Sequence, residues 1–254
     1  MTAPARALGI ASLSALAYVL CDLLHELGHL AATRLPLGVT AVSISTVGVS
    51  TDVSSAAVAS AGSVVNLVLA AGLFIACASS VSPSWRYFSW LLGTINLFNA
   101  AAYLLYSAIL GSGDWAVVLG AAPAALWRPL AGLAGAAAYT VSVYAALNVL
   151  RRLVASGVIA GANAGRYCAI SYWVGGVLVT FAAVFNPVSP WLILTSGAAT
   201  GFGAMVGLML LPRLLRPTDA SGESIEIGWA WIVAAAAAAG IFVGLFGPGL
   251  RLSM

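Results

Sequence analysis

His25 and His29 are the only two histidines in the chain, and Glu26 directly follows the first of them. On an α-helix, residues four apart lie on one face about one turn, roughly 6 Å, apart. Two neutral imidazoles placed in this way can bind one zinc ion, and the glutamate can then act as base toward a water molecule. The alternative is that the two histidines are core residues that happen to be neighbours. The spacing favours a zinc site in which His25 and His29 are ligands and Glu26 is the catalytic base.

A catalytic zinc site has three protein ligands, so this motif needs one more. Besides Glu26, the first 218 residues contain three acidic side chains, Asp22, Asp52 and Asp114. Asp22 lies on the histidine face one turn before His25, where it is better placed to orient that imidazole through a hydrogen bond. Asp52 lies at the edge of a segment expected to be extended, where capping the next helix is the ordinary role.

Asp114 is the residue that we expect to be the third ligand. It follows the third hydrophobic segment, and the C-terminal ends of the first and third helices meet on one side if those helices run parallel. A charge at the centre of a membrane helix costs about 2.5–3.5 kcal/mol, which favours a functional reason for its presence. Two alternatives stay open at this point. Asp114 could cap a helix over residues 115–119, and Asp52 could be the ligand instead.

The composition indicates an integral membrane protein. Hydrophobic residues make up 62% of the chain and charged residues 7%, with a mean hydropathy of +1.04, whereas soluble domains carry about 25% charged residues. Residues 8–24 are almost wholly apolar and continue without a break into His25, so one helix carries the motif into the bilayer. A cleaved signal peptide is the alternative for this segment, but its removal would separate the motif from its helix. We expect a multi-pass protein of the cell membrane.

Three features resemble the site-2 protease family of intramembrane zinc metalloproteases. The first is the H-E-x-x-H motif inside the first hydrophobic segment. The second is the sequence AGSVVN at 61–66, which is similar to the family's small-residue motif ending in asparagine. The third is Asn99 followed by GSGDW at 111–115, which resembles the region that supplies the family's third zinc ligand. Asp114 is followed by tryptophan rather than glycine, and the family's usual prolines before it are missing.

This resemblance covers residues 8 to about 120 and implies a metalloprotease-like core there, with additional transmembrane helices over 121–254. It implies one Zn²⁺ per chain and a membrane-anchored protein substrate that is hydrolysed in or near its transmembrane segment. Asn66 and Asn99 could hydrogen-bond the backbone of such a substrate, or could join helices. Two other functions remain possible: a catalytically silent zinc-binding scaffold and a zinc carrier. A carrier would need polar residues in more than one span.

The fold class that we expect is an all-α membrane bundle forming a single domain over residues 1–254. Hydrophobicity predicts about seven transmembrane helices, with six to eight possible. They cover residues 8–32, 56–80, 87–110, 131–150, 169–186, 191–211 and 229–247. An eighth pass over 114–127 is the alternative. Residues 212–228 form the one clearly polar loop.

Residues 39–53 are rich in β-branched side chains, contain Gly48 and are poor in helix formers, which predicts a β-hairpin. A strand edge beside a protease site could hold an extended substrate by strand addition. The hairpin could equally be a plug or a surface turn.

The ten basic residues are all arginines, and they are dispersed at the ends of the hydrophobic segments. This distribution indicates anchors in the lipid bilayer and excludes a nucleic-acid-binding patch. With seven spans, seven arginines fall on the N-terminal side and three on the other. The positive-inside rule then places the N-terminus in the cytoplasm and the zinc nearer the outside. The family resemblance implies a zinc nearer the cytoplasm, and an eighth pass would remove the conflict.

Overall fold

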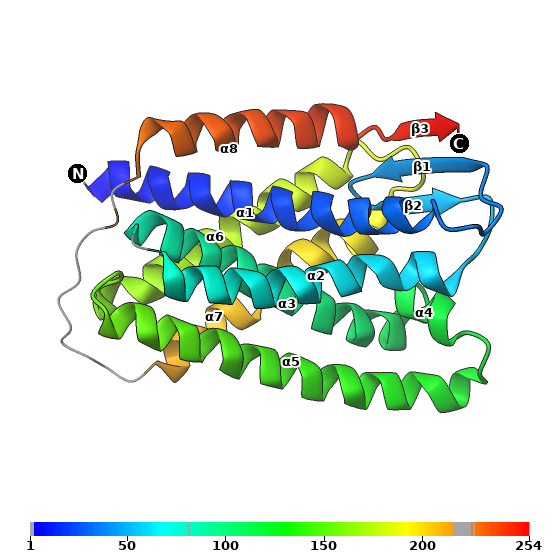
Figure 1. Cartoon of the computed structure of the whole chain (residues 1–254), viewed down its shortest axis with the longest axis horizontal. Helices are drawn as coiled ribbons and strands as arrows, with labels where there is room; N and C mark the ends of the chain where they lie inside the picture. The colour runs from blue at the N-terminus through cyan, green and yellow to red at the C-terminus, as the bar shows by residue number, and fades with distance from the viewer. Residues whose placement is uncertain (1–2, 81, 216–224, 226, 254) are drawn as a thin grey trace.

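A computed structural model describes residues 3–80, 82–215, 225 and 227–253 of the chain. Long helices lie side by side and alternate in direction, and a small sheet lies at one end of the bundle (Figure 1). The helices are α1 (Ala3–Ala32), α2 (Ala56–Ser79), α3 (Pro83–Leu110), α4 (Asp114–Leu119), α5 (Ala124–Ala155), α6 (Gly161–Ala183), α7 (Gly207–Leu214) and α8 (Trp229–Ile241). Two π-helices, η1 (Ile193–Gly203) and η2 (Phe242–Phe246), precede α7 and follow α8. The strands are β1 (Ala41–Ser45), β2 (Gly48–Thr51) and β3 (Leu250–Ser253).

Within the described residues, six helical segments are long and apolar enough to cross a membrane. They are α1, α2, α3, α5, the η1–α7 segment and the α8–η2 segment. The remaining expected span falls on α6, which has 23 residues and is not among the six. The eighth pass proposed over 114–127 is wrong, because that stretch is divided between the six-residue α4 and the start of α5. Most of the polar loop at 212–228 lies outside the described residues.

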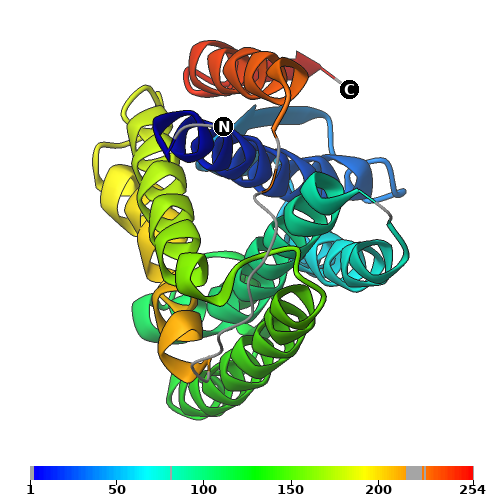
Figure 2. The ribbon, with the colours of Figure 1, turned by 90° about the vertical axis from the view of Figure 1, so that its left-hand side faces the viewer.

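The third helix forms the centre of the bundle. In the most apolar 18-residue stretch of α3, 72% is buried inside the protein, whereas the corresponding value for the segment that contains α8 is 11%. Figure 2 shows α8 at the outside of the bundle, against α1. Trp90 of α3 is fully buried and donates its indole N–H to the carbonyl of Ala146 at 3.1 Å. The position of α3 matters for function because its C-terminal end leads directly to Asp114.

Two helices begin earlier in the chain than expected, and each contains a proline near its start. The third helix begins at Pro83 rather than at residue 87, with the proline in the first turn, where its fixed φ suits a helix and its missing N–H has no partner to lose. The fourth expected span begins at Ala124 rather than at 131 and contains Pro129. A proline there removes one backbone hydrogen bond near the start of a 32-residue helix, and the helix continues through it.

The expected hairpin is confirmed. β1 pairs antiparallel with β2, and Ser45 lies opposite Gly48 at the turn. β3 was not expected; it pairs antiparallel with the other side of β1, which gives the strand order β2-β1-β3. The fold class is therefore mostly helical with a three-stranded sheet rather than all-α. Within this sheet, β1 is central and β2 keeps one unpaired edge.

Candidate metal centre

Two glycines let α1 and α2 approach closely beside the histidines. A Cβ atom at Gly28, inside the motif, would lie 2.8 Å from the Val65 side chain and 3.1 Å from the carbonyl oxygen of Ala61. Gly62 on α2 faces the motif in the same way, and a Cβ there would lie 2.7 Å from Nε2 of His25. The backbone of α2 therefore forms one wall of the site.

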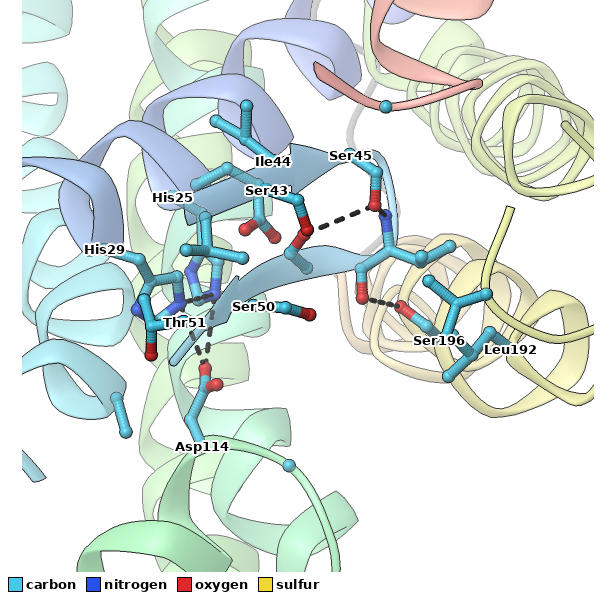
Figure 3. A pocket seen from close by; sticks show the side chains of 18 of the residues that line it. His25, His29, Ser43, Ile44, Ser45, Ser50, Thr51, Asp114, Leu192 and Ser196 are labelled. Carbon is cyan, nitrogen blue, oxygen red and sulfur yellow. Dashed lines mark hydrogen bonds and ion pairs between the residues drawn. The ribbon is translucent and has the colours of Figure 1, made fainter. Parts of the chain in front are cut away.

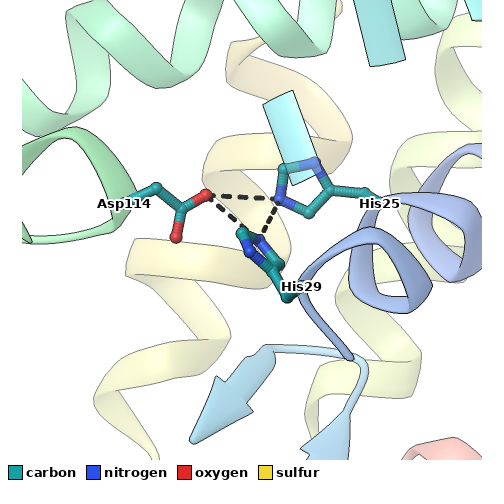
Figure 4. A group of neighbouring side chains, drawn as sticks. All are labelled: His25, His29 and Asp114. Carbon is teal, nitrogen blue, oxygen red and sulfur yellow. Dashed lines mark hydrogen bonds and ion pairs between the residues drawn. The ribbon is translucent and has the colours of Figure 1, made fainter. Parts of the chain in front are cut away.

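The two imidazoles and the carboxylate of Asp114 converge on one point (Figure 4). Nε2 of His25 lies 3.0 Å from Nε2 of His29. Oδ2 of Asp114 lies 3.3 Å from the first of these nitrogens and 3.4 Å from the second. Among the residues that the structure describes, these three form the one group of His, Cys, Asp or Glu side chains whose ligand atoms could meet at a metal.

His29 is oriented by the start of α2. Its Nδ1 lies 2.6 Å from the carbonyl oxygen of Val58, and both residues are buried. A carbonyl oxygen can only accept a hydrogen bond, so Nδ1 of His29 carries the proton. In a neutral His29, Nε2 then carries no proton, and its lone pair is directed toward His25 and Asp114. This is the form of histidine that binds a metal.

His25 has different neighbours. Its Nδ1 lies 3.2 Å from the side-chain amide nitrogen of Asn66, and its ring lies 4.8 Å from the ring of Tyr103, centre to centre, at an interplanar angle of 34°. The expected hydrogen bond from Asp22 to His25 is not the contact found, because Asn66 takes this position. Asp22 instead lies one helical turn before Glu26.

Asp114 reaches the histidines from the short segment after α3. Gly111 and Gly113 have φ angles of 69° and 88°, a left-handed conformation that glycine adopts at little cost. Together they turn the chain so that α4 begins with Asp114. Arg128 of α5 donates from Nε to the carbonyl of Ala108 at 2.8 Å and from Nη2 to the carbonyl of Ile109. The end of α3 is thereby held in place just before this turn.

The carboxylate of Asp114 is directed at the imidazoles rather than at a helix terminus. The cap residue of α4 is Gly113, with no side-chain cap bond, so the capping alternative for Asp114 is wrong. Burial by itself would raise the pKa of Asp114, but contact with His25 and His29 outweighs it and lowers the pKa to about 2. The carboxylate is therefore ionised and available as a ligand at neutral pH.

Asp52 lies outside this group. Both of its carboxylate oxygens accept a hydrogen bond from the backbone N–H of Thr40 at 3.1 Å, and one also accepts from the Thr40 hydroxyl. The hydrogen bond from that hydroxyl holds the pKa of Asp52 below its usual range. The expected cap of α2 at Asp52 is wrong as well, because Ser55 is the cap residue and accepts from the N–H of Val58. Asp52 instead ties together the two ends of the hairpin.

Glu26 lies beside the three candidate ligands. It is 3% exposed, and its Oε2 has no hydrogen-bond partner within the protein. Asn66 and Asn99 are both buried and contact side chains of α1: Asn66 contacts His25, and Asn99 donates to Sγ of Cys21 at 3.6 Å. Neither lines the cavity described below, so both asparagines join helices.

A cavity of about 780 Å³ opens in front of the cluster (Figure 3). Its walls are α1 at the motif, the hairpin, the start of α2, the end of α3, the start of α4, the η1 segment and the approach to β3. Hydroxyl groups are frequent in its lining, among them Ser43, Ser45, Ser50, Thr51, Ser54, Ser55, Ser112, Thr195, Ser196 and Thr200. The hairpin lines the site, so it is not a remote surface turn.

The turn of the hairpin is fixed from both sides. Ser196 of η1 donates its hydroxyl to the carbonyl of Val47 at 3.4 Å. The backbone N–H of Thr46 donates to the carbonyl of Phe246 at the end of η2 at 3.1 Å. Both π-helices therefore connect the hairpin to the bundle, and the sheet has a defined place above the cavity.

The residues present fit a zinc ion. Zinc bonds of about 2.0–2.1 Å in a tetrahedral site require ligand atoms about 3.3–3.4 Å apart, and the three ligand atoms here are separated by 3.0, 3.3 and 3.4 Å. Two imidazole nitrogens and a carboxylate oxygen form a donor set that zinc accepts. The cavity leaves the fourth side of the cluster open for a substrate or water. Oε2 of Glu26 is buried without a hydrogen-bond partner, as expected of a group that acts on a further atom.

Comparison of the chain with protein-family models, with curated proteins and with solved structures returned no match in any of the three.

Proposed function

We propose that the protein is a zinc-dependent intramembrane endopeptidase, an integral protein of the cell membrane that resembles the site-2 protease family. The observation that carries this proposal is the convergence of His25, His29 and Asp114 at one point, with Glu26 beside them on the same cavity. A motif read from spacing alone could be accidental. A third ligand more than 80 residues away in the sequence would not be expected at the same point by accident.

Each side chain has one role. His25, His29 and Asp114 would hold the ion. When bound, zinc would act as a Lewis acid: it would make a water molecule nucleophilic near neutral pH and polarise a carbonyl group. Glu26 accepts a proton from the water molecule as its oxygen bonds to the scissile carbonyl carbon. As the C–N bond breaks, Glu26 returns that proton to the leaving amine. The products are a carboxyl group and a free amine.

The unpaired edge of β2 supports a role in substrate binding. A helical segment hides its carbonyl groups in its own hydrogen bonds, so a membrane-anchored substrate must become extended before it can be hydrolysed. An extended peptide could add to β2 as a further strand, since β3 already covers the opposite edge of β1. The hydroxyl groups of the cavity would offer further hydrogen bonds to its backbone. In the other interpretation the hairpin is a plug that must move before substrate enters.

The two rival functions have less support. Within the described residues, one place only gathers three metal-ligating side chains, whereas a zinc carrier needs polar groups along a path through the bundle. A silent scaffold would have no need of a buried glutamate that lacks a hydrogen-bond partner and faces the cavity beside the cluster.

The experiment that tests the proposal combines metal analysis with a cleavage assay. Purified protein should contain about one zinc per chain, and co-expression with a panel of single-span membrane proteins should yield a cleaved member. The Glu26→Gln variant serves as the inactive control. Zinc content without cleavage of any substrate would favour the scaffold, and zinc flux into vesicles would favour the carrier.

A further inference from the structure

Tyr103 on α3 packs against one of the candidate zinc ligands. Its ring lies 4.8 Å from the ring of His25, centre to centre, at an interplanar angle of 34°. It also lines the same cavity as His25, Glu26 and Asp114. The central helix of the bundle therefore contributes a side chain of its own to the wall of the metal centre, in addition to leading the chain to Asp114.

The hydroxyl group of Tyr103 makes no hydrogen bond to any residue that the structure describes. Other hydroxyl groups of the cavity are already used, since those of Thr51, Thr195 and Thr200 donate to backbone carbonyls. A phenol hydroxyl can donate one hydrogen bond. Tyr103 therefore has a donor available to a molecule that enters the cavity beside the metal centre.

The proposed hydrolysis needs a donor at this place. As the water oxygen bonds to the scissile carbonyl carbon, one electron pair of the C=O bond moves onto the carbonyl oxygen, which becomes negatively charged. Donors directed at such an oxygen are among the largest contributions to catalysis of acyl transfer. The carboxylate groups of Glu26 and Asp114 cannot donate. Asn66 and Asn99, which could have bonded a substrate, do not line the cavity.

We propose that Tyr103 is a catalytic residue whose hydroxyl donates a hydrogen bond to this oxygen. The inference rests on the proposed function. The hydroxyl keeps its proton throughout: as the C–N bond breaks, the electron pair returns from the oxygen to re-form the C=O bond, and the leaving amine takes its proton from Glu26. A hydrogen bond to a charged oxygen is stronger than one to a neutral carbonyl. Tyr103 therefore stabilises the transition state more than the bound substrate.

Three conservative substitutions separate this role from packing. Tyr103→Phe removes the hydroxyl alone and keeps the ring that packs on His25, so metal affinity should equal that of wild type. Tyr106→Phe tests the neighbouring tyrosine of the cavity, whose ring centre lies 6.0 Å from that of Tyr103. Tyr144→Phe on α5 is the matched control, because Tyr144 is 53% exposed and does not line the cavity.

The first measurement does not depend on proteolysis. Protein loaded with Co²⁺ has a visible absorption that changes when a further ligand binds the metal. The probe is dimethylphosphinate, a tetrahedral anion that can place one oxygen on the metal and the other at the Tyr103 hydroxyl. The control probe is 2-mercaptoethanol, which binds a metal through its sulfur. Tyr103→Phe should bind the phosphinate about 10–100-fold more weakly than wild type and the thiol equally well.

The second measurement uses a substrate that the cleavage panel identifies. Removing one donor to the developing oxyanion lowers kcat by about 10²–10³-fold in other acyl-transfer enzymes, and we expect a loss of this size in Tyr103→Phe. KM should change little, because the neutral carbonyl of the bound substrate gains less from the hydrogen bond than the charged oxygen does. Tyr106→Phe and Tyr144→Phe should retain the wild-type kcat.

The outcomes distinguish this inference from the proposed function. Wild-type protein that takes up no metal overturns both. Metal uptake with equal phosphinate affinity in wild type and Tyr103→Phe overturns the role of Tyr103 alone, and so does a loss confined to Tyr106→Phe. Loss of metal in Tyr103→Phe would mean that the hydroxyl supports the structure of the site, which also overturns the catalytic role. Phosphinate binding decides the question even if no member of the panel is cleaved.

Discussion

Gly62 lies directly against His29: a Cβ atom at residue 62 would lie 2.5 Å from Nε2 of His29 and 2.7 Å from Nε2 of His25. These two nitrogens are the atoms that would bind the metal. The glycine therefore does more than let two helices pack closely, because its missing side chain leaves the space in which both imidazoles can turn toward Asp114.

We expect Gly62→Ala to displace the imidazoles and weaken zinc binding. Overpacking of this kind costs about 1–3 kcal/mol, equivalent to roughly a 5–150-fold loss of affinity. Chelator competition measures the change. Gly72→Ala on the same helix is the matched control, because a Cβ there meets no atom within 4 Å. Equal zinc affinity in the two variants would show that the imidazoles can bind metal from another position.

Glu26→Gln should lower the rate of cleavage by orders of magnitude while zinc stays bound. Glutamine has the size and polarity of glutamate but cannot accept a proton, and loss of a general base reduces rates by about 10²–10⁴-fold. Metal analysis and a single-substrate cleavage assay on the same preparation measure the two effects. Cleavage at the wild-type rate would exclude Glu26 as the base.

Replacing each carboxylate in turn ranks the candidates for the third ligand. Asp114→Ala should lose zinc or bind it far more weakly, and activity should fall with it. Asp52→Ala should keep its zinc, because that carboxylate is bonded to Thr40. Asp22→Ala should keep its zinc as well, because Asn66 and not Asp22 contacts Nδ1 of His25. Zinc content should be compared only among variants that extract and migrate like wild type. Zinc loss in Asp52→Ala together with zinc retention in Asp114→Ala would move the ligand to the hairpin.

The local part of the site could be predicted from sequence because it depends on helical periodicity alone. His25 and His29 are four apart, so any helix through them places both imidazoles on one face. Asp114 required a further assumption, that the first and third helices run parallel, and Figure 1 shows that α1 and α3 do. The hairpin was predictable because its β-branched residues and its turn lie in one continuous segment.

The contacts that orient the imidazoles could not be predicted in this way. The contacts of Asn66 with His25 and of Val58 with His29 depend on how α1 crosses α2, and no local pattern specifies that crossing. β3 was missed because four residues carry too little periodicity, and its partner β1 lies near the other end of the chain. α5 begins at Ala124, before the expected start at residue 131, because Pro129 near the start of the helix removes only one backbone hydrogen bond and does not end it.

Arg128→Gln should loosen the segment that carries Asp114. The guanidinium binds the carbonyls of Ala108 and Ile109 at the end of α3, and hydrogen bonds from a charged group contribute about 1.5–3 kcal/mol each. We expect zinc affinity to fall, though less than in Asp114→Ala, because the ligand itself remains. Arg151→Gln, whose guanidinium binds the carbonyl of Leu214, is the control. A zinc affinity equal to that of the control would mean that the two glycines hold the turn unaided.

The arginines predict the orientation of the bundle in the membrane. The long helical segments alternate in direction, so the N-terminus and the sheet lie at opposite ends (Figure 1). Among the described residues, the N-terminal end holds Arg6, Arg86, Arg151, Arg152, Arg166 and Arg213, and the opposite end holds Arg34, Arg128 and Arg251. By the positive-inside rule the N-terminus is cytoplasmic, and the candidate zinc site lies toward the outer face.

In a bacterial host, a fluorescent protein fused to the N-terminus should be bright, and alkaline phosphatase fused to the C-terminus should be active. The reverse pattern would place the site near the cytoplasm, as the family resemblance implies, and would show that these arginines do not determine the topology.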